Sequence, residues 1–258
     1  MNFAHLMPFQ SIAPILIKNE EFPEFPFFSG TGFFVKFNPY NSIYFITAKH
    51  CTLNHDNSPK GIVGVPLQQN SECNKKIIFS HYLLAKTNND ADFDDIIIYV
   101  VDISFENQFD LLKDRCLRLL HQEDVDNILD YVLSIKGKLR AVGCPGTEEK
   151  QINYDTRQST IQPRGIVGCL SSASDDKLNY TIDNINWKSS NGGMDGFSGS
   201  PIIEFIPNIN RTGIESIPVG VFSTGNAKII KFVSIKVVTD AIAEYINLAS
   251  TSTNGDTP

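Results

Sequence analysis

Short apolar runs separated by turn residues dominate the first hundred positions of the chain. Between residues 33 and 37 apolar side chains alternate in a period of two, which is typical of a strand. The turn-forming segment 38–42 follows, and the apolar run 43–47 comes directly after it. This pattern predicts an antiparallel pair of strands. By the same reasoning, further strands are predicted at residues 11–17, 61–67, 76–84 and 96–101.

A helical pattern interrupts the strands in the middle of the chain. Apolar residues between 109 and 133 recur at spacings of three and four, which predicts one or two amphipathic helices. Strands are predicted again at residues 138–142, 165–168, 179–187, 201–205, 219–225 and 232–238. The segment 240–248 predicts a terminal helix with Thr239 or Asp240 as its N-cap. Residues 250–258 are rich in Ser, Thr, Asn and Gly, and predict a flexible tail or linker.

Composition narrows the classes of protein to consider. The 258 residues are 41% hydrophobic and 20% charged, as in ordinary globular proteins. The net charge is −7 and Lys and Arg form no dense run, so we do not expect nucleic acid as a partner. No stretch approaches the roughly 20 apolar residues of a membrane span, so no membrane partner is expected. We also expect no cofactor.

The cysteines and the start of the chain bear on its location. Five cysteines form an odd set with no closely spaced pair, and residues 1–50 contain none. The first residues lack a basic segment followed by an apolar one, so no secretory signal is visible. Free thiols in a reducing compartment are the simpler interpretation, and we expect the protein in the cytoplasm.

Three short motifs carry candidate chemistry. Thr47–Cys51 places a histidine just past a predicted strand, Asp95 directly precedes an apolar strand, and Gly196–Pro201 places Ser198 in a glycine-rich turn. A serine hydroxyl is a poor nucleophile at neutral pH unless a base lies beside it, and an acid commonly orients that base. The order His, Asp, Ser is one of the chain orders known to build this hydrolytic geometry.

On these motifs and their order, the chain resembles the trypsin-like serine peptidases of the chymotrypsin superfamily. It looks closer to the intracellular, HtrA-like bacterial branch than to the secreted enzymes, because Phe197 precedes the serine where those enzymes carry an Asp. The resemblance implies an all-β fold of two six-stranded antiparallel Greek-key barrels, with a helical insertion between them and a C-terminal helix. The implied divisions are residues 1–105, the connector 106–137, the second barrel with its helix 138–249, and the tail 250–258.

The resemblance also implies roles for individual residues. Ser198 is the implied nucleophile, His50 its base and Asp95 the acid that orients the base. Asp92 and Asp94 in the same loop stay open as alternatives for the acid. The backbone N–H groups of Gly196 and Ser198 are the implied oxyanion hole.

The substrate-binding residues follow from the same resemblance. One wall of the pocket is Gly192, Gly193 and Met194, and the other is Ser223, Thr224 and Gly225. These small or apolar residues predict a small or apolar substrate side chain at P1. Lys228 or Lys231 offers an alternative in which an acidic side chain is selected.

Other readings of the chain remain open. Some histidines and cysteines, among them Cys73 and His81, could in principle bind zinc. Their spacing along the chain does not match that of compact zinc sites, so no metal is expected. The helical segment 109–133 either packs over the seam between the barrels or docks another chain. A protein or peptide substrate is the expected partner, and a catalytically silent peptide-binding module is the alternative function. Analogy with intracellular trypsin-like modules suggests a role in bacterial defence.

Overall fold

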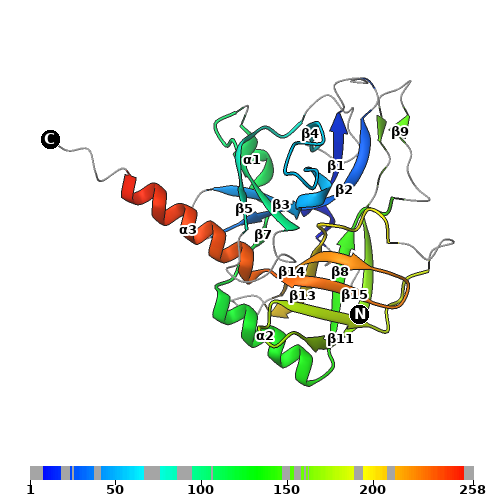
Figure 1. The fold of residues 1–258 in the computed structure, drawn as a ribbon. Helices are drawn as coiled ribbons and strands as arrows, with labels where there is room; N and C mark the ends of the chain where they lie inside the picture. The colour runs from blue at the N-terminus through cyan, green and yellow to red at the C-terminus, as the bar shows by residue number, and fades with distance from the viewer. Residues whose placement is uncertain are drawn as a thin grey trace.

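The computed structural model of the chain describes residues 8–18, 24, 26–37, 42–66, 76–85, 95–105, 107–146, 152–153, 158–159, 161, 163–188, 194–207 and 213–252. Two β-rich halves lie against each other, and the terminal helix projects from the body (Figure 1).

The first half is a seven-stranded sheet. Its strands are β1 (Ile12–Lys18), β2 (Phe27–Lys36), β3 (Ile43–Ala48), β4 (Ile62–Gly64), β5 (Phe79–Leu84), β6 (Ile96–Val101) and β7 (Leu117–Arg118). Six pair antiparallel in the order β4-β1-β2-β3-β6-β5, and β7 adds to β2 in parallel. The two ends of this path approach each other, because the Ile77 N–H donates to the Val65 carbonyl at 2.9 Å. The six antiparallel strands therefore curl into an incompletely paired barrel, to which β7 is added.

The second half is a closed barrel. Its six strands are β8 (Lys138–Gly143), β11 (Arg164–Ala173), β12 (Asn179–Asp183), β13 (Pro201–Pro207), β14 (Ile214–Gly225) and β15 (Ile230–Ser234). They close in the order β11-β12-β15-β14-β13-β8. The short strands β9 (Ile152–Asn153) and β10 (Gln158–Ser159) form a separate two-stranded sheet among the described residues. The predicted mainly-β architecture with a helical insertion and a terminal helix is confirmed.

Strand β2 joins the cores of the two halves. Phe34 packs into the interior of the first half, where its ring lies 4.9 Å from that of Phe45. Phe33 and Val35, on the opposite face of the strand, belong to the larger cluster that extends through the second half. Because both faces of β2 are buried, its sequence is apolar at successive positions as well as alternate ones.

The helical segments differ from the prediction in two places. Helix α1 (Gln108–Leu112) and helix α2 (Gln122–Ser134) are separated by β7, so residues 113–121 are not helical. Leu119 is buried there through pairing with β2, because its N–H donates to the Lys36 carbonyl at 3.0 Å. The period-3.6 pattern thus included residues that are buried in a strand-like segment.

Helix α3 (Lys236–Ser252) also begins earlier than predicted. The predicted strand 232–238 ends at Ser234, and the prediction of Thr239 or Asp240 as N-cap is wrong. Val237 and Val238 are apolar because they are buried in the first turn of the helix, not because they continue the strand. The helix continues to Ser252, so the beginning of the predicted tail is helical.

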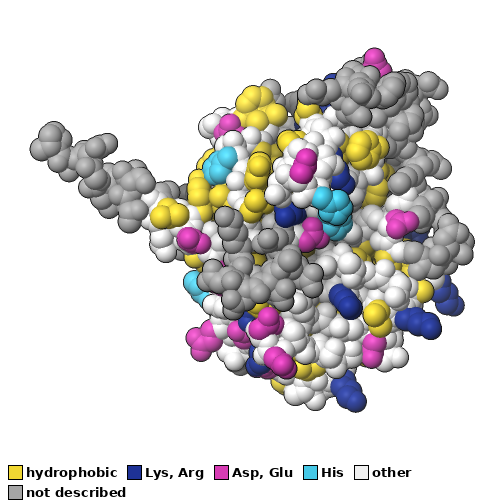
Figure 2. Space-filling view, in the orientation of Figure 1, with side chains coloured by type: hydrophobic (Ala, Val, Ile, Leu, Met, Phe, Trp, Pro, Cys, Tyr) yellow, Lys and Arg dark blue, Asp and Glu magenta, His cyan; other side chains and the backbone are white. Residues whose placement is uncertain are grey.

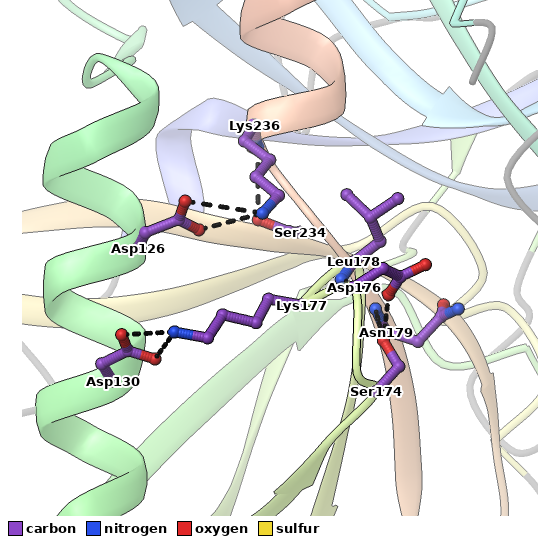
Figure 3. A network of polar contacts seen from close by, with 9 residues as sticks. All are labelled: Asp126, Asp130, Ser174, Asp176, Lys177, Leu178, Asn179, Ser234 and Lys236. Atoms are coloured by element: carbon purple, nitrogen blue, oxygen red, sulfur yellow. Dashed lines mark hydrogen bonds and ion pairs between the residues drawn. The ribbon is translucent and has the colours of Figure 1, made fainter. Parts of the chain in front are cut away.

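Two ion pairs attach α2 to the second half (Figure 3). Lys236 Nζ lies 3.1 Å from an Asp126 oxygen, and Lys177 Nζ lies 2.7 Å from an Asp130 oxygen. The Lys236 side chain is only 8% exposed, so its partner Asp126 compensates a charge that is largely out of water. Acidic side chains gather over α2 on the face shown in Figure 2.

One buried tyrosine offers a test of the packing. The Tyr180 hydroxyl is buried without a hydrogen-bond partner among the described residues. A buried hydroxyl without a partner destabilises a fold, so Tyr180→Phe is expected to raise the free energy of unfolding by about 1 kcal/mol. Urea denaturation measures the change, and a lower free energy of unfolding in Tyr180→Phe would contradict the assignment.

Candidate active site

The register between β3 and β6 brings His50 and Asp95 together. Ala48, the last residue of β3, stands opposite Ile96, the first of β6. A single 3₁₀ turn, Lys49–Cys51, follows β3 and carries His50, while Asp95 comes immediately before β6. Antiparallel pairing therefore places the turn that follows β3 beside the residue that precedes β6, and His50 is the middle residue of that turn.

Both carboxylate oxygens of Asp95 contact His50. The Nδ1 atom of the ring lies 2.6 Å from Oδ2, and the backbone N–H of His50 donates to Oδ1 at 3.0 Å. This double contact fixes the position and the plane of the imidazole. It also assigns the Nδ1 proton to the bond with Asp95, which leaves Nε2 as the other ring nitrogen.

The same pair changes the acidity of the imidazole. The hydrogen bond to Asp95 is the main cause that raises the pKa of His50 from 6.5 to about 10. A hydrogen bond to the Cys51 side chain adds to this effect, and burial opposes it. Nearly half of the His50 side chain is exposed, at 46%, so solvent moderates the interaction.

This shift predicts how the stability of the protein depends on pH. A pKa raised in the folded state means that the pair stabilises the fold fully below pH 6.5. The stabilisation is lost as the pH rises from 6.5 through about 10. The unfolding free energies of wild type and Asp95→Asn are therefore expected to converge between pH 6.5 and pH 10. A difference in unfolding free energy that widened over this range would contradict the raised pKa of His50.

Ser198 lies in a turn that requires glycine on both sides of it. Gly196 and Gly199 have φ angles of +89° and +81°, which side-chain-bearing residues rarely adopt. A Cβ on Gly196 would lie 2.4 Å from the Cys144 carbonyl oxygen, and a Cβ on Gly199 would lie 2.6 Å from the Ala48 nitrogen. The backbone of the second half thus turns tightly against its surroundings here.

Two backbone N–H groups of the turn are oriented by hydrogen bonds to the carbonyls of their own peptides. The Asp195 carbonyl accepts from the Gly146 N–H at 2.6 Å, and the Phe197 carbonyl accepts from the Ser200 N–H at 2.9 Å. In a trans peptide the N–H points away from the carbonyl, so the N–H groups of Gly196 and Ser198 face away from these bonds. Neither of the two donates a hydrogen bond to any residue that the structure describes.

The Ser198 backbone contacts the first half beside His50. Its carbonyl accepts from the Thr31 N–H at 3.0 Å and from the Cys51 thiol at 3.6 Å. Cys51 is the neighbour of His50 in the chain, so the serine turn and the histidine turn are joined through these bonds. The Ser198 hydroxyl itself forms no hydrogen bond within the described residues.

Part of the predicted substrate pocket lies within the described residues. Met194 is buried, and its sulfur would lie 2.8 Å from a Cβ on Gly225, so residues of the two predicted walls are adjacent. Ser223 is half-buried and Thr224 is exposed in β14. Gly192 and Gly193, like Asp92 and Asp94, lie outside the described residues. Lys228 and Lys231 are exposed.

Other candidate ligands lie apart from this site. His81 packs against the Tyr245 ring and His121 against the Phe37 ring. In the described part of the chain, no three His, Cys, Asp or Glu side chains are grouped so as to hold a metal ion. The four described cysteines, Cys51, Cys116, Cys144 and Cys169, are unpaired. No helix among the described residues is long and apolar enough to cross a membrane.

Comparison with known proteins identifies the fold. The sequence matches no protein-family model and no curated protein. The structure, in contrast, is similar to a thermostable serine protease, AL20, from an extremophilic microorganism. The TM-score is 0.56 at 10% sequence identity, over 90% of this chain and 95% of that one.

A second similar structure is human heparin binding protein. It gives a TM-score of 0.54 at 15% identity, covering 97% of this chain and 95% of that one. A mutant of the same human protein gives 0.56 at 14% identity, covering 98% and 95%. The chain therefore has the two-barrel, chymotrypsin-like fold of serine proteases. At these identities the likeness establishes the fold and leaves the activity to be argued from the site.

Proposed function

We propose that the protein is a trypsin-like serine endopeptidase in which Ser198, His50 and Asp95 form the catalytic triad. The observation that carries the proposal is the double contact between His50 and Asp95 beside the serine turn. The unused N–H groups of Gly196 and Ser198 support it, because such donors stabilise the oxyanion of an acyl-transfer reaction.

The proposed reaction follows from the chemistry of these groups. His50 Nε2 takes the proton of the Ser198 hydroxyl while the hydroxyl oxygen attacks the peptide carbonyl. The N–H groups of Gly196 and Ser198 stabilise the negative oxygen that forms, by about 3 kcal/mol for each donor. His50 then gives its proton to the leaving amine, and water releases the acyl group from Ser198 by the same steps in reverse order. Asp95 holds the ring and stabilises its charged form.

The raised pKa of His50 has a consequence for this reaction. Only the neutral imidazole can take a proton from Ser198, and the fraction of neutral imidazole grows as the pH approaches about 10. We therefore expect hydrolysis to be faster at alkaline pH than at pH 7.

Cleavage of an unfolded protein tests the proposal. Wild-type protein at pH 9 is expected to cut reduced, alkylated casein into peptides, and Ser198→Ala purified in parallel is expected to leave it intact. Equal cutting by both samples would assign the activity to a contaminant, and no cutting by the wild type would count against the proposal.

A binding module with the same fold is the second candidate function. Two observations favour it: the Ser198 hydroxyl makes no hydrogen bond among the described residues, and a structural neighbour is named for binding heparin. Peptide binding that is equal in wild type and Ser198→Ala, with no cleavage by the wild type, would support this candidate.

We also propose which substrate side chain the protein prefers at P1 and in which cellular role it acts. Met194 against Gly225 suits a small or apolar P1 side chain, and a P1 peptide library would overturn this by showing a preference for Asp or Glu.

Phe197, which is fully buried, supports a relationship to the HtrA-like branch, in which no new N-terminus is needed for activation. The free thiols fit a cytoplasmic protease module of bacterial defence, and plating phage on cells with and without the gene tests that role.

A further inference from the structure

One buried side chain of the first half is bonded to the serine turn of the second half. Thr31 lies in β2, is fully buried and is flanked by two glycines. Its side-chain hydroxyl donates to the Gly196 carbonyl at 2.6 Å and accepts from the Cys144 N–H at 2.9 Å. Its hydroxyl therefore makes one donated and one accepted bond, both to the other half of the molecule.

The backbone of Thr31 contributes to the same interface. Its N–H donates to the Ser198 carbonyl at 3.0 Å, and its carbonyl accepts from the Thr47 hydroxyl at 2.6 Å. Pro14, which has no N–H to donate, stands opposite Thr31 in β1. The N–H of this strand residue is therefore bonded outside its own sheet, to the serine turn, whereas its carbonyl stays bonded to β3.

Together with bonds inside the second half, the bonds from Thr31 hold the backbone of the serine turn in place. Four successive carbonyls, from Asp195 to Ser198, all accept hydrogen bonds, and Thr31 supplies the donors for two of them. The peptide that joins Gly196 to Phe197 is held from both sides, because its N–H donates to the Met194 carbonyl at 3.1 Å. Rotation of this peptide would break both bonds and would change the directions of the flanking N–H groups of Gly196 and Ser198.

We propose that Thr31 is a positioning residue that holds the nucleophile turn through its hydroxyl. This inference rests on the proposed function, since the turn matters for rate only if Ser198 reacts. The hydroxyl is the specific part: a glycine or alanine at this position would keep the backbone bond to Ser198 and lose the bonds to Gly196 and Cys144. Loss of the hydroxyl is expected to disturb catalysis more than substrate binding.

The test compares two buried threonine-to-valine substitutions. Thr31→Val removes the hydroxyl at nearly constant volume, and Thr31→Ser retains it. Thr239→Val is the matched control, because Thr239 is also buried and its hydroxyl donates to the Leu120 carbonyl at 3.3 Å, in the interface with α3. Thr31→Ala is made in parallel as a second variant without the hydroxyl, and it replaces Thr31→Val if that variant does not fold.

The expected kinetic result is a fall in kcat and little change in KM. Misplacement of reacting groups by about 1 Å costs roughly 100-fold in rate, so we expect Thr31→Val to lower kcat by about 10- to 100-fold. Thr31→Ser is expected to remain within about threefold of wild type, and Thr239→Val should lose thermal stability without losing kcat. Equal kcat values for Thr31→Val and Thr239→Val would overturn the inference.

Hydrogen exchange separates this inference from the proposed function. In Thr31→Val, exchange of the backbone amides between residues 195 and 200 is expected to become at least tenfold faster, and in Thr239→Val it should stay as in wild type. This readout needs no activity. If the wild type were inactive, the proposed function would fail, and unchanged exchange in Thr31→Val would independently overturn the positioning role.

Discussion

Asp95→Asn is expected to reduce kcat at neutral pH by roughly 10⁴-fold while leaving the fold intact. An amide cannot accept the Nδ1–H bond and the backbone N–H bond with the two charged oxygens that Asp95 provides. The ring would then adopt the other tautomer, with its proton on the nitrogen that has to take the proton from Ser198. Loss of the negative charge also removes the stabilisation of the imidazolium.

The matched control for this substitution is Asp110→Asn. Asp110 also forms an ion pair, with Lys113 at 2.8 Å, but its side chain is 67% exposed and lies on α1. Exposed pairs of this kind contribute about 0–1 kcal/mol to stability, so neither rate nor stability should change appreciably. Steady-state kinetics on a peptide substrate provide the comparison. Similar rates for the two variants would remove Asp95 from the proposed triad.

Gly199→Ala is expected to give the largest loss of stability. The φ angle of Gly199 is +81°, and a Cβ there would lie 2.2 Å from the Thr47 hydroxyl and 2.4 Å from the Thr31 carbonyl. Strain at a positive φ and overpacking of a buried site each cost about 1–3 kcal/mol, so we expect a loss of about 3–5 kcal/mol. Denaturant unfolding monitored by tryptophan fluorescence measures it, because Trp187 packs on the Phe197 ring.

Gly64→Ala is the control for Gly199→Ala. Gly64 lies in β4 without a positive φ, and the nearest atom to an added Cβ is the Leu16 carbonyl oxygen at 3.3 Å. We expect a change within about 1 kcal/mol, in either direction. A loss at Gly199 no larger than that at Gly64 would contradict the account of the serine turn.

The sequence allowed most of the strands to be predicted, because their periods and turn residues are local signals. The adjacency of His50 and Asp95 could be expected from the family resemblance, and the structure gives its physical cause in the register of Ala48 against Ile96. Local signals failed where tertiary burial decided the structure. Val237 and Val238 suited both a strand and a helix, and only packing selected the helix.

The role of Thr31 could not be predicted from local pattern at all. Its partners Cys144 and Gly196 are 113 and 165 residues away in the chain. A small polar residue between two glycines in an apolar strand was the one available signal, and it indicates close approach of another backbone without saying which one. Partners at such distances become visible only when the two halves are assembled.

Covalent labelling by a fluorophosphonate probe tests the central claim most directly, since the probe reacts with a serine only when a base and an oxyanion hole activate it. We expect one probe per molecule at pH 9, located on Ser198 by mass spectrometry of the digest. Ser198→Ala should remain unlabelled, and His50→Ala should label far more slowly. A wild-type protein that stayed unmodified, or that carried the probe on another residue, would contradict the assignment of Ser198 as the nucleophile.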